Sequence, residues 1–362
     1  MKVLVTGAAG FIGSHVVRAL VAAGHEVRAL HLPGDDLRNL LGLDVERISG
    51  DVTDAGSLRR AMRGCEQVFH LAAVYALWTR DPGLMQRVNV DGTRLVLEVA
   101  REAGVARVIY TSSIARFGGQ GPGRRATEAS PFALGPTGDV YARSKADAHE
   151  VALAAARAGQ DVVIVAPTGP IGPGDVGPTP TGRLIVAALN LPAVVVANSV
   201  SSFAHVADRA AGHLLAAARG RAGETYLLGA EDVALADLAR RTLALAGLRK
   251  PVIVAPFALA RLGAHAALLV TRHVTHRPPL VTPAAVAIAR LGLAADASKA
   301  VRELGFAPRP LDEALRDALV WFAQEGYVRD PHLRAHLLAR LAAPCQTPPH
   351  ADPDRAARVA RG

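Results

Sequence analysis

The first 30 residues, "MKVLVTGAAGFIGSHVVRALVAAGHEVRAL", hold the pattern that most restricts the fold of this chain. An apolar run at 3–5 predicts a buried strand, and the apolar spacing over 12–23 predicts a helix that ends at Gly24. A second apolar run at 27–30 predicts another strand. Strand, glycine-rich turn, helix and strand in this order predict a βαβ unit.

The turn of this unit has the glycine spacing G-x-x-G-x-x-G. Gly7 would allow the tight turn out of the strand, Gly10 would let the backbone approach a pyrophosphate, and Gly13 would let the helix pack close to the sheet. The free N–H groups at the helix N-terminus would then face the phosphates. The unit therefore predicts a dinucleotide-binding domain.

Strands and helices keep alternating further along the chain, which predicts an α/β fold with a doubly wound parallel sheet (Rossmann) and a smaller C-terminal substrate domain. In such a sheet, ligands bind outside the carboxyl ends of the strands. The further strands are expected at 45–51, 67–74, 107–115 and 161–167.

The domain borders follow from this topology. We expect residues 1–166 to form the dinucleotide-binding domain, with 203–220 returning to it, and 167–328 to form most of the substrate domain. Residues 329–362 are basic and rich in proline, which predicts a frayed or disordered tail.

Several short motifs together resemble the extended short-chain dehydrogenase/reductases, the NAD-dependent epimerase/dehydratase family, over about residues 1–328. Within that family the chain is most similar to hopanoid-associated sugar epimerases and dihydroflavonol-4-reductase-like proteins. The motifs are G-x-x-G-F-I-G at the N-terminus, "GDVTD" (50–54), "HLAA" (70–73), "NVDGT" (89–93), "YTSS" (110–113) and Y-x-x-x-K at Tyr141 and Lys145.

The resemblance implies a catalytic role for Ser113, Tyr141 and Lys145. Residues four apart share a helix face, so Lys145 can stand beside Tyr141 and a nicotinamide ribose. We expect the lysine ammonium and an oxidised nicotinamide to favour the phenolate, so that Tyr141 passes a proton to or from a substrate oxygen while hydride moves. Ser113 would hydrogen-bond that oxygen, with Ser112 and Thr111 as nearby competitors. The structural alternative is a half-buried tyrosine beside a solvated lysine.

The same resemblance implies a set of cofactor-binding residues: Gly7, Gly10, Phe11, Ile12, Gly13, Asp51, Val52, Leu71, Ala72, Ala73, Tyr141, Lys145 and Pro167. An acidic residue after the second strand would favour binding of NAD, whereas an arginine at that position would favour binding of NADP. Leu32 stands where reductase-like relatives tend to have arginine, and Asp35 and Asp36 come slightly late. We therefore expect NAD(P), with a lean towards NADP.

The substrate residues implied are Tyr75, Trp78, Thr168 and His205, with a purely structural role as the alternative for His205. Ser201 and Ser202 stand where relatives acting on nucleotide sugars usually carry arginine and aspartate. This departure predicts a less charged substrate. An apolar stretch at 251–274 suggests an entrance for a terpenoid or lipid, or contact with a membrane surface, against the alternative of a helix packed on the small domain.

Charge and cysteine content exclude other classes of function. The net charge is +9, but the basic residues are scattered and form no block interleaved with aromatics, so we expect no nucleic-acid partner. Cys65 and Cys345 have no metal-ligand spacing, and no apolar run reaches the length of a membrane span, so we expect no metal and a cytoplasmic protein.

Three functions remain open: a reductase or dehydrogenase, an epimerase, and a non-catalytic cofactor sensor. The resemblance also leaves a homodimer open.

Overall fold

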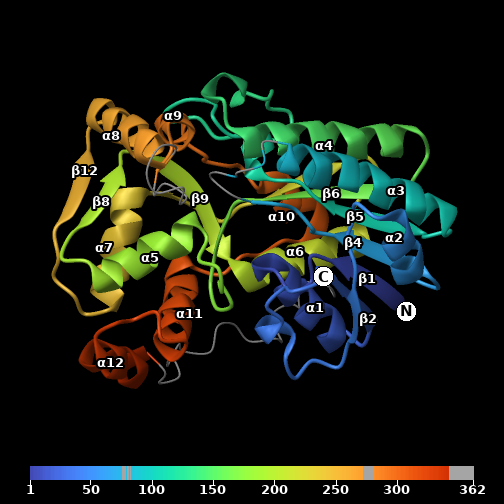
Figure 1. Ribbon diagram of the computed structural model, residues 1–362, viewed down its shortest axis with the longest axis horizontal. Coiled ribbons are helices and arrows are strands. Elements are labelled where there is room, and N and C mark those ends of the chain that lie inside the picture. The colour runs from blue at the N-terminus through green and yellow to red at the C-terminus, as the bar shows by residue number, and fades with distance from the viewer. Residues whose placement is uncertain (76–78, 80, 82, 272–280, 342–362) are drawn as a thin grey trace, which may run out of the picture.

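The computed structural model describes residues 1–75, 79, 81, 83–271 and 281–341. Its largest element is a seven-stranded sheet in which all neighbouring strands are parallel, in the order β10-β6-β5-β4-β1-β2-β3 (Figure 1). The strand order reverses between β1 and β4, as in a doubly wound sheet, so the predicted fold class is confirmed. The strands are β1 (Lys2–Thr6), β2 (Glu26–His31), β3 (Glu46–Ser49), β4 (Gln67–His70), β5 (Arg107–Thr111), β6 (Val162–Pro167) and β10 (Thr225–Leu228).

Helices cover both faces of this sheet, which is why its central strands read as continuous apolar runs. In β1, Val3 and Val5 belong to the core on one face and Leu4 to the core on the other, all without solvent exposure. Full burial of such a side chain contributes about 1.5–3 kcal/mol. One face carries α1 (Phe11–Ala22) and α6 (Val206–Arg219); the other carries α2 (Ala55–Met62), α3 (Gly92–Glu102) and α4 (Val140–Arg157).

The chain leaves this sheet after β6 and returns to it later. Helix α6 packs against α1, strand β10 forms the outer strand beside β6, and α10 (Ser298–Leu304) packs on α6. These contacts place segments after residue 200 in the same layer as the N-terminal βαβ unit. The exact domain borders stay a prediction.

The remaining elements form a second, smaller group on the side of the carboxyl ends of the large sheet (Figure 1). Its largest apolar core contains Ile185, Phe203, Leu238, Leu315 and Phe322. The group contains β7 (Gly169–Ile171), β9 (Val200–His205) and β11 (Glu231–Ala234) in one small sheet, β8 (Val194–Ala197) and β12 (Val252–Ala255) in another, and α5 (Pro180–Asn190), α7 (Leu235–Leu245) and α11 (Leu311–Gln324).

Two apolar helices lie at the outer end of this group. Helix α8 (Phe257–Val270) has 14 residues and packs against α9 (Pro283–Leu291), as the upper left of Figure 1 shows. Within the described residues, no helix has both the length and the apolar character needed to cross a membrane.

Part of the predicted tail is ordered. Residues Pro331–Leu341 form α12, which packs against α11 and buries Leu337 and Leu341 in the core of the smaller group. The expectation of a disordered tail from residue 329 is therefore wrong for this segment, because its leucines recur at helical spacing and face an apolar partner. Residues 342–362 lie outside the described part of the chain.

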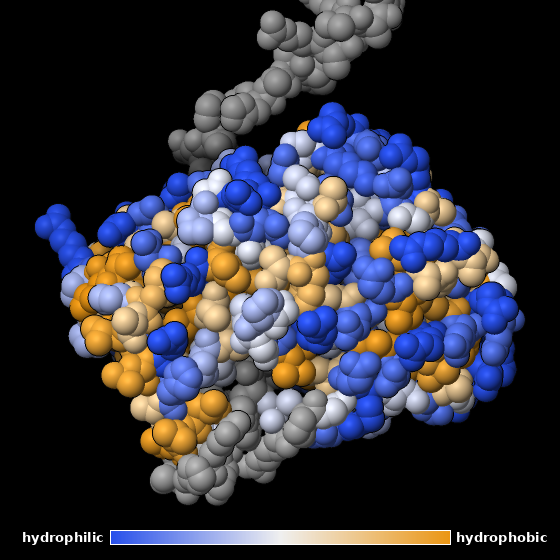
Figure 2. Space-filling model, turned by 90° about the horizontal axis from the view of Figure 1, so that it is seen from above, coloured by the Kyte–Doolittle hydropathy of each residue, from blue (hydrophilic) through white to orange (hydrophobic). Residues whose placement is uncertain are grey.

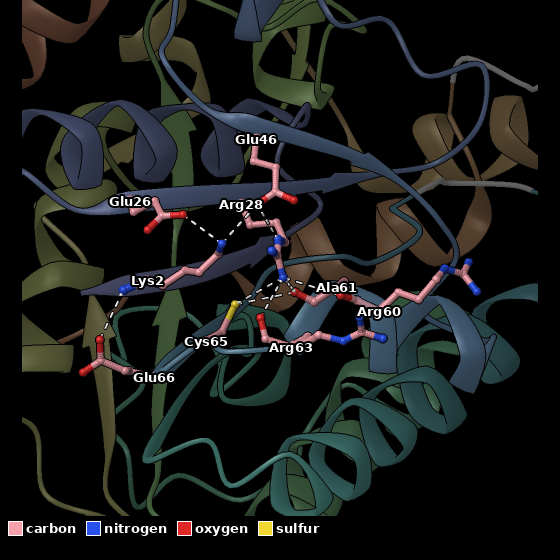
Figure 3. Close-up of polar contacts among 9 residues, drawn as sticks. All are labelled: Lys2, Glu26, Arg28, Glu46, Arg60, Ala61, Arg63, Cys65 and Glu66. Carbon is pink, nitrogen blue, oxygen red and sulfur yellow. Dashed lines mark hydrogen bonds and ion pairs between the residues drawn. The ribbon is translucent and has the colours of Figure 1, made fainter.

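A buried arginine joins strand β2 to the end of helix α2. Figure 3 shows the Arg28 guanidinium pointing at the last turn of α2, where it donates to the carbonyls of Ala61 at 2.7 Å and Arg63 at 3.0 Å. Its Nε donates to Glu46 on β3 at 2.8 Å. The carbonyls at a helix C-terminus lack partners and carry partial negative charge, so Arg28 satisfies them and fixes α2 on the sheet.

Candidate active site

The glycine turn after β1 packs directly against the end of β4. Gly7 has φ of 67°, and a Cβ there would lie 2.7 Å from the backbone N of Ala72. A Cβ at Gly13 would lie 2.1 Å from the carbonyl oxygen of Gly7. A side chain at either position would collide with backbone, so the turn needs glycine in the way that the sequence predicts.

The first turn of α1 is open to an anion. Gly10 precedes the helix without a side-chain cap, and the first turn has no acidic residue. The N–H groups of Phe11, Ile12 and Gly13 at the positive end of the helix dipole are therefore available to donate to a ligand. A diphosphate fits this chemistry.

The other residues expected at a cofactor lie at the same edge of the sheet. Leu71 and Ala72 follow β4, and their N–H groups donate to the backbone and side-chain oxygens of Thr6. Asp51 follows β3 and accepts from the Thr53 N–H at 2.8 Å, and Val52 beside it is buried. Ala73 also follows β4 and is exposed, while Pro167 is the buried last residue of β6. Their contact with a cofactor stays a prediction.

The loop after β2 brings an acidic residue closer to the end of this strand than the sequence suggests. Gly34 has φ of 85°, and the turn lets the Asp35 carboxylate accept from the Leu32 N–H at 2.9 Å. Asp36 is paired with Arg38 at 2.8 Å. Asp35 therefore lies at the end of β2 although it comes late in the sequence. This position removes one reason to expect NADP as the cofactor.

The hydroxyls of Thr111, Ser112 and Ser113 at the end of β5 have different partners. Thr111 Oγ1 lies 2.9 Å from His213 Nε2, and Ser112 Oγ lies 3.1 Å from His149 Nδ1. Ser113 Oγ accepts from the Ala115 N–H, and Ser113 lies close enough to Tyr141 to lower the pKa of its phenol. Of these three neighbours, Ser113 is the one brought to Tyr141.

Tyr141 lies in the first turn of α4, half-buried beside Ser113 and Tyr75. Asp139 caps the helix by accepting from the Ala142 N–H at 2.7 Å, which fixes where α4 begins. The ring centroids of Tyr141 and Tyr75 are 4.6 Å apart. Burial raises the pKa of Tyr141 to about 12, against a smaller opposite effect of the neighbouring Ser113. In the protein alone the neutral phenol is therefore favoured, because desolvation outweighs the stabilising contacts. The phenolate expected beside an oxidised nicotinamide stays a prediction.

Lys145 lies one helical turn after Tyr141 and is fully enclosed. Its Nζ donates to the Thr111 carbonyl at 2.6 Å and lies 5.0 Å from the centre of the Tyr110 ring. Burial lowers the pKa of Lys145 to about 7. The alternative of a solvated lysine is wrong, since only 4% of this residue is exposed.

Residues 3–229 match the sequence profile of the NAD dependent epimerase/dehydratase family. The chain belongs to this family. The match includes the glycine turn, the Ser113 strand end and the helix with Tyr141 and Lys145. The predicted resemblance to extended short-chain dehydrogenase/reductases is confirmed.

Curated and solved relatives cover nearly the same length. The chain is 39% identical over 329 residues to a putative dihydroflavonol 4-reductase from Synechocystis sp., covering 90% of this chain and 95% of the relative. It is 36% identical to sterol demethylase protein B from Methylococcus capsulatus, covering 91% and 100%. Among solved structures, a dTDP-glucose 4,6-dehydratase double mutant from Streptomyces venezuelae with NAD bound has a TM-score of 0.72 and 27% identity, covering 90% and 98%.

As a member of this family, the protein is an NAD(P)-dependent oxidoreductase or epimerase. The residues present fit the cofactor: the glycine turn offers a cradle that a Cβ would fill, and the first turn of α1 offers unpaired N–H groups. Gly7, Gly10 and Gly13 would hold the diphosphate, and Lys145 would lie near the nicotinamide ribose.

Two further buried residues support the site: His149, which the sequence analysis did not single out, and Asn89 of the "NVDGT" motif. His149 continues the face of α4 that carries Tyr141 and Lys145, and its position four residues after Lys145 was the available signal. Asn89 donates to Ser144 Oγ on α4 at 2.9 Å and exchanges two hydrogen bonds with the backbone of Val74. Asn89 thus ties the segment before Tyr75 to the catalytic helix.

Two of the expected substrate contacts are already engaged. His205 accepts from the Ala207 N–H through Nδ1, and its Nε2 lies 3.0 Å from Asp317. The Thr168 hydroxyl accepts from Arg209 and is 3.4 Å from the Leu228 carbonyl. Both side chains are buried with protein partners, which fits the structural alternative for His205, and the substrate role of both residues stays a prediction. Tyr75 stays a candidate, and Trp78 lies outside the described residues.

An apolar wall stands beside Tyr141. Tyr141 packs in a cluster built on buried Leu134 and Ala142, which also contains Ile288 and Leu291 from α9. The two α9 side chains come from a part of the chain about 150 residues after Tyr141, whereas Leu134 and Ala142 are its near neighbours in sequence. Its chemistry suits an uncharged substrate ring.

Proposed function

We propose that this enzyme is a reductase or dehydrogenase that transfers hydride at a secondary alcohol or ketone of a mainly apolar substrate. The observation that carries the proposal is the position of the half-buried Tyr141 beside Ser113 and an apolar wall, together with the pKa of about 12 that keeps its phenol neutral. A neutral phenol is the right species to give a proton to a carbonyl oxygen as it becomes an alkoxide.

When bound, NAD(P) supplies or accepts the hydride at its nicotinamide. The residues of this chain do the rest. Ser113 orients the substrate oxygen, Tyr141 gives or takes the proton at that oxygen, and Lys145 holds the ribose end of the cofactor from within the protein. The half-exposed ring of Tyr75 would press the substrate towards Tyr141.

Three features support an apolar substrate. Ser201 and Ser202 replace the charged pair expected for nucleotide sugars, and Ser202 is buried. The wall next to Tyr141 is apolar, with aliphatic side chains from α9 and the aromatic ring of Phe132. A relative of nearly full length is named for sterol demethylation. A polycyclic terpenoid alcohol or ketone, including one of a hopanoid pathway, is the substrate class that we propose.

For the cofactor we propose NAD rather than NADP. The expected lean towards NADP rested on the lack of a carboxylate at the end of β2, but Asp35 lies there on the Leu32 amide. A carboxylate accepts from a ribose diol and repels a phosphate. We also propose that the enzyme works in the cytoplasm, where both cofactors are abundant.

An epimerase is the second candidate, because transient oxidation and re-reduction would use the same Ser113, Tyr141 and Lys145. A cofactor sensor without catalysis is the third, and a buried lysine and an enclosed phenol argue against it, since binding alone requires neither.

The deciding experiment is a titration of the purified protein with NADH and NADPH, followed by nicotinamide absorbance while ketones, alcohols and sugar nucleotides are added. We expect net oxidation of NADH by apolar ketones. Tyr141→Phe should abolish turnover and keep cofactor binding, whereas Tyr226→Phe, in the edge strand β10, should change neither. Binding with no net redox change across the panel would favour the epimerase, and full turnover by Tyr141→Phe would refute the assigned proton donor.

A further inference from the structure

The outer end of the smaller group exposes an unusual amount of apolar surface. Figure 2 shows apolar side chains gathered at the end of the molecule that carries α8 and β12. Leu259 and Leu262 on α8 are 64% and 69% exposed. The apolar residues of this surface, which we call the α8 face, are Ile253, Val254, Leu259, Leu262, Leu269 and Val270.

Helix α8 has little packing of its own to explain these side chains. Among its 14 residues only Ala264 is buried. Among the described elements, α9 is its main packing partner. A helix that is exposed and apolar around most of its circumference usually contacts another protein or a membrane.

The sequence that carries this face has basic residues and no acidic ones. From residue 238 to 295 it contains no Asp or Glu, and it places Arg261 on α8 and Arg290 on α9. Arg240 and Arg241 on α7 are paired with acidic side chains. Arg261 projects from α8 beside Leu262 and His265, with which it lines a shallow surface hollow. Within the part of the chain that the structure describes, Arg261 forms no ion pair with an acidic residue.

We propose that the α8 face docks on an anionic lipid bilayer. Exposed leucines enter the boundary between headgroups and acyl chains, and basic side chains in the same region attract the negative surface. A second copy of this chain is the weaker occupant, because a two-fold contact through α8 would bring Arg261 close to its own counterpart without an acidic partner.

The docking surface is connected to the reaction site by packing. Helix α9 contacts α8 on one side and the turn η4 (Gly135–Thr137) on the other, and η4 lies just before the cap of the catalytic helix. Ile288 and Leu291 of α9 reach the cluster of Tyr141. This step rests on the proposed function: an apolar substrate dissolved in the bilayer would meet the apolar wall of the site from the α8 side.

The test is co-sedimentation of the full chain with vesicles. The vesicles are pure phosphatidylcholine or equal parts of phosphatidylcholine and phosphatidylglycerol. We expect the protein to bind the anionic vesicles and to be released by high salt, since exposed charges are screened within about 10 Å at 0.1 M. Leu259→Ser combined with Leu262→Ser should weaken binding about tenfold or more. Leu41→Ser, at a leucine that is 63% exposed beside α1, is the matched control and should bind as the unmodified chain.

Each outcome decides the proposal. No binding to anionic vesicles, or equal loss in the Leu41→Ser control, would overturn it. Sedimentation velocity showing a dimer that the α8 variant dissociates would assign the face to a second copy instead. Turnover of a water-soluble ketone without vesicles keeps the two proposals apart: the α8 variant should retain it, and its absence from the unmodified protein would count against the proposed function alone.

Discussion

The Ser112 hydroxyl lies 3.1 Å from Nδ1 of His149, and both side chains are buried. Burial lowers the pKa of His149 to about 3, so the imidazole is neutral and serves as a hydrogen-bond partner. Because successive side chains alternate along an extended strand, Ser113 points the other way, to Tyr141. Neighbouring serines in one motif thus have different surroundings: Ser112 ties the strand end to α4, and Ser113 is the one that we propose for the reacting oxygen.

Alanine substitutions should separate these tasks. We expect Ser113→Ala to lower kcat/KM by about 100-fold, since it removes a hydrogen bond to the developing oxyanion. Ser112→Ala should leave kcat/KM within about threefold and lower the free energy of unfolding by about 1–3 kcal/mol, because His149 loses its buried partner. Steady-state kinetics and urea denaturation measure both. Equal kinetic losses in the two variants would contradict the assignment.

Lys145 should make the protein without cofactor more stable as the pH rises. Its pKa is about 7 in the folded protein and 10.5 ordinarily, so between these values the unfolded chain binds more protons than the folded one. The contribution of Lys145 to the free energy of unfolding therefore increases from about pH 7 to pH 10.

Lys145→Met tests this sign. The variant should lose hydride transfer and, at pH 7, unfold with a free energy roughly 1–3 kcal/mol higher, because no buried ammonium has to be desolvated. Denaturant midpoints at pH 7 and pH 9 should rise for the unmodified protein and stay level for the variant. A parallel rise in both would show that other groups cause the pH dependence.

The loop after β2 should determine the choice between cofactors. Leu32→Arg, at a half-exposed side chain, is expected to strengthen NADPH binding by about tenfold relative to NADH, because a guanidinium pairs with the extra phosphate. Fluorescence titrations with both nucleotides measure the ratio. Leu41→Arg adds the same charge elsewhere, and a similar change in that variant would mean that charge alone, not this position, is responsible.

Arg28 should matter for stability and not for catalysis. Arg28→Met leaves the α2 carbonyls of Ala61 and Arg63 without their donor, and we expect a loss of about 2–3 kcal/mol in the free energy of unfolding. Arg59→Met removes an exposed pair with Glu102 and should cost less than about 1 kcal/mol. Thermal and urea unfolding provide the comparison, and equal losses would show that the buried contacts of Arg28 contribute nothing special.

Local patterns were sufficient for the fold class. The apolar runs and the glycines at 7, 10 and 13 have steric and packing consequences within a few residues, so they could be interpreted from the sequence. The ordered helix α12 in the tail could not be predicted from the sequence. It is held by the face of α11, and no residue near α12 in the sequence reveals this partner.

For the site, the sequence by itself determined the helix that places Lys145 one turn after Tyr141, and the glycine turn that this fold requires. Only the tertiary structure decided that Ser113 and not Ser112 meets Tyr141, that His205 and Thr168 have their polar atoms occupied, and that Asp35 folds back to β2. Only the tertiary structure also set the direction of the Tyr141 pKa. These properties depend on burial and on partners up to 112 residues apart, and desolvation is a property of the whole packed environment that no local pattern encodes.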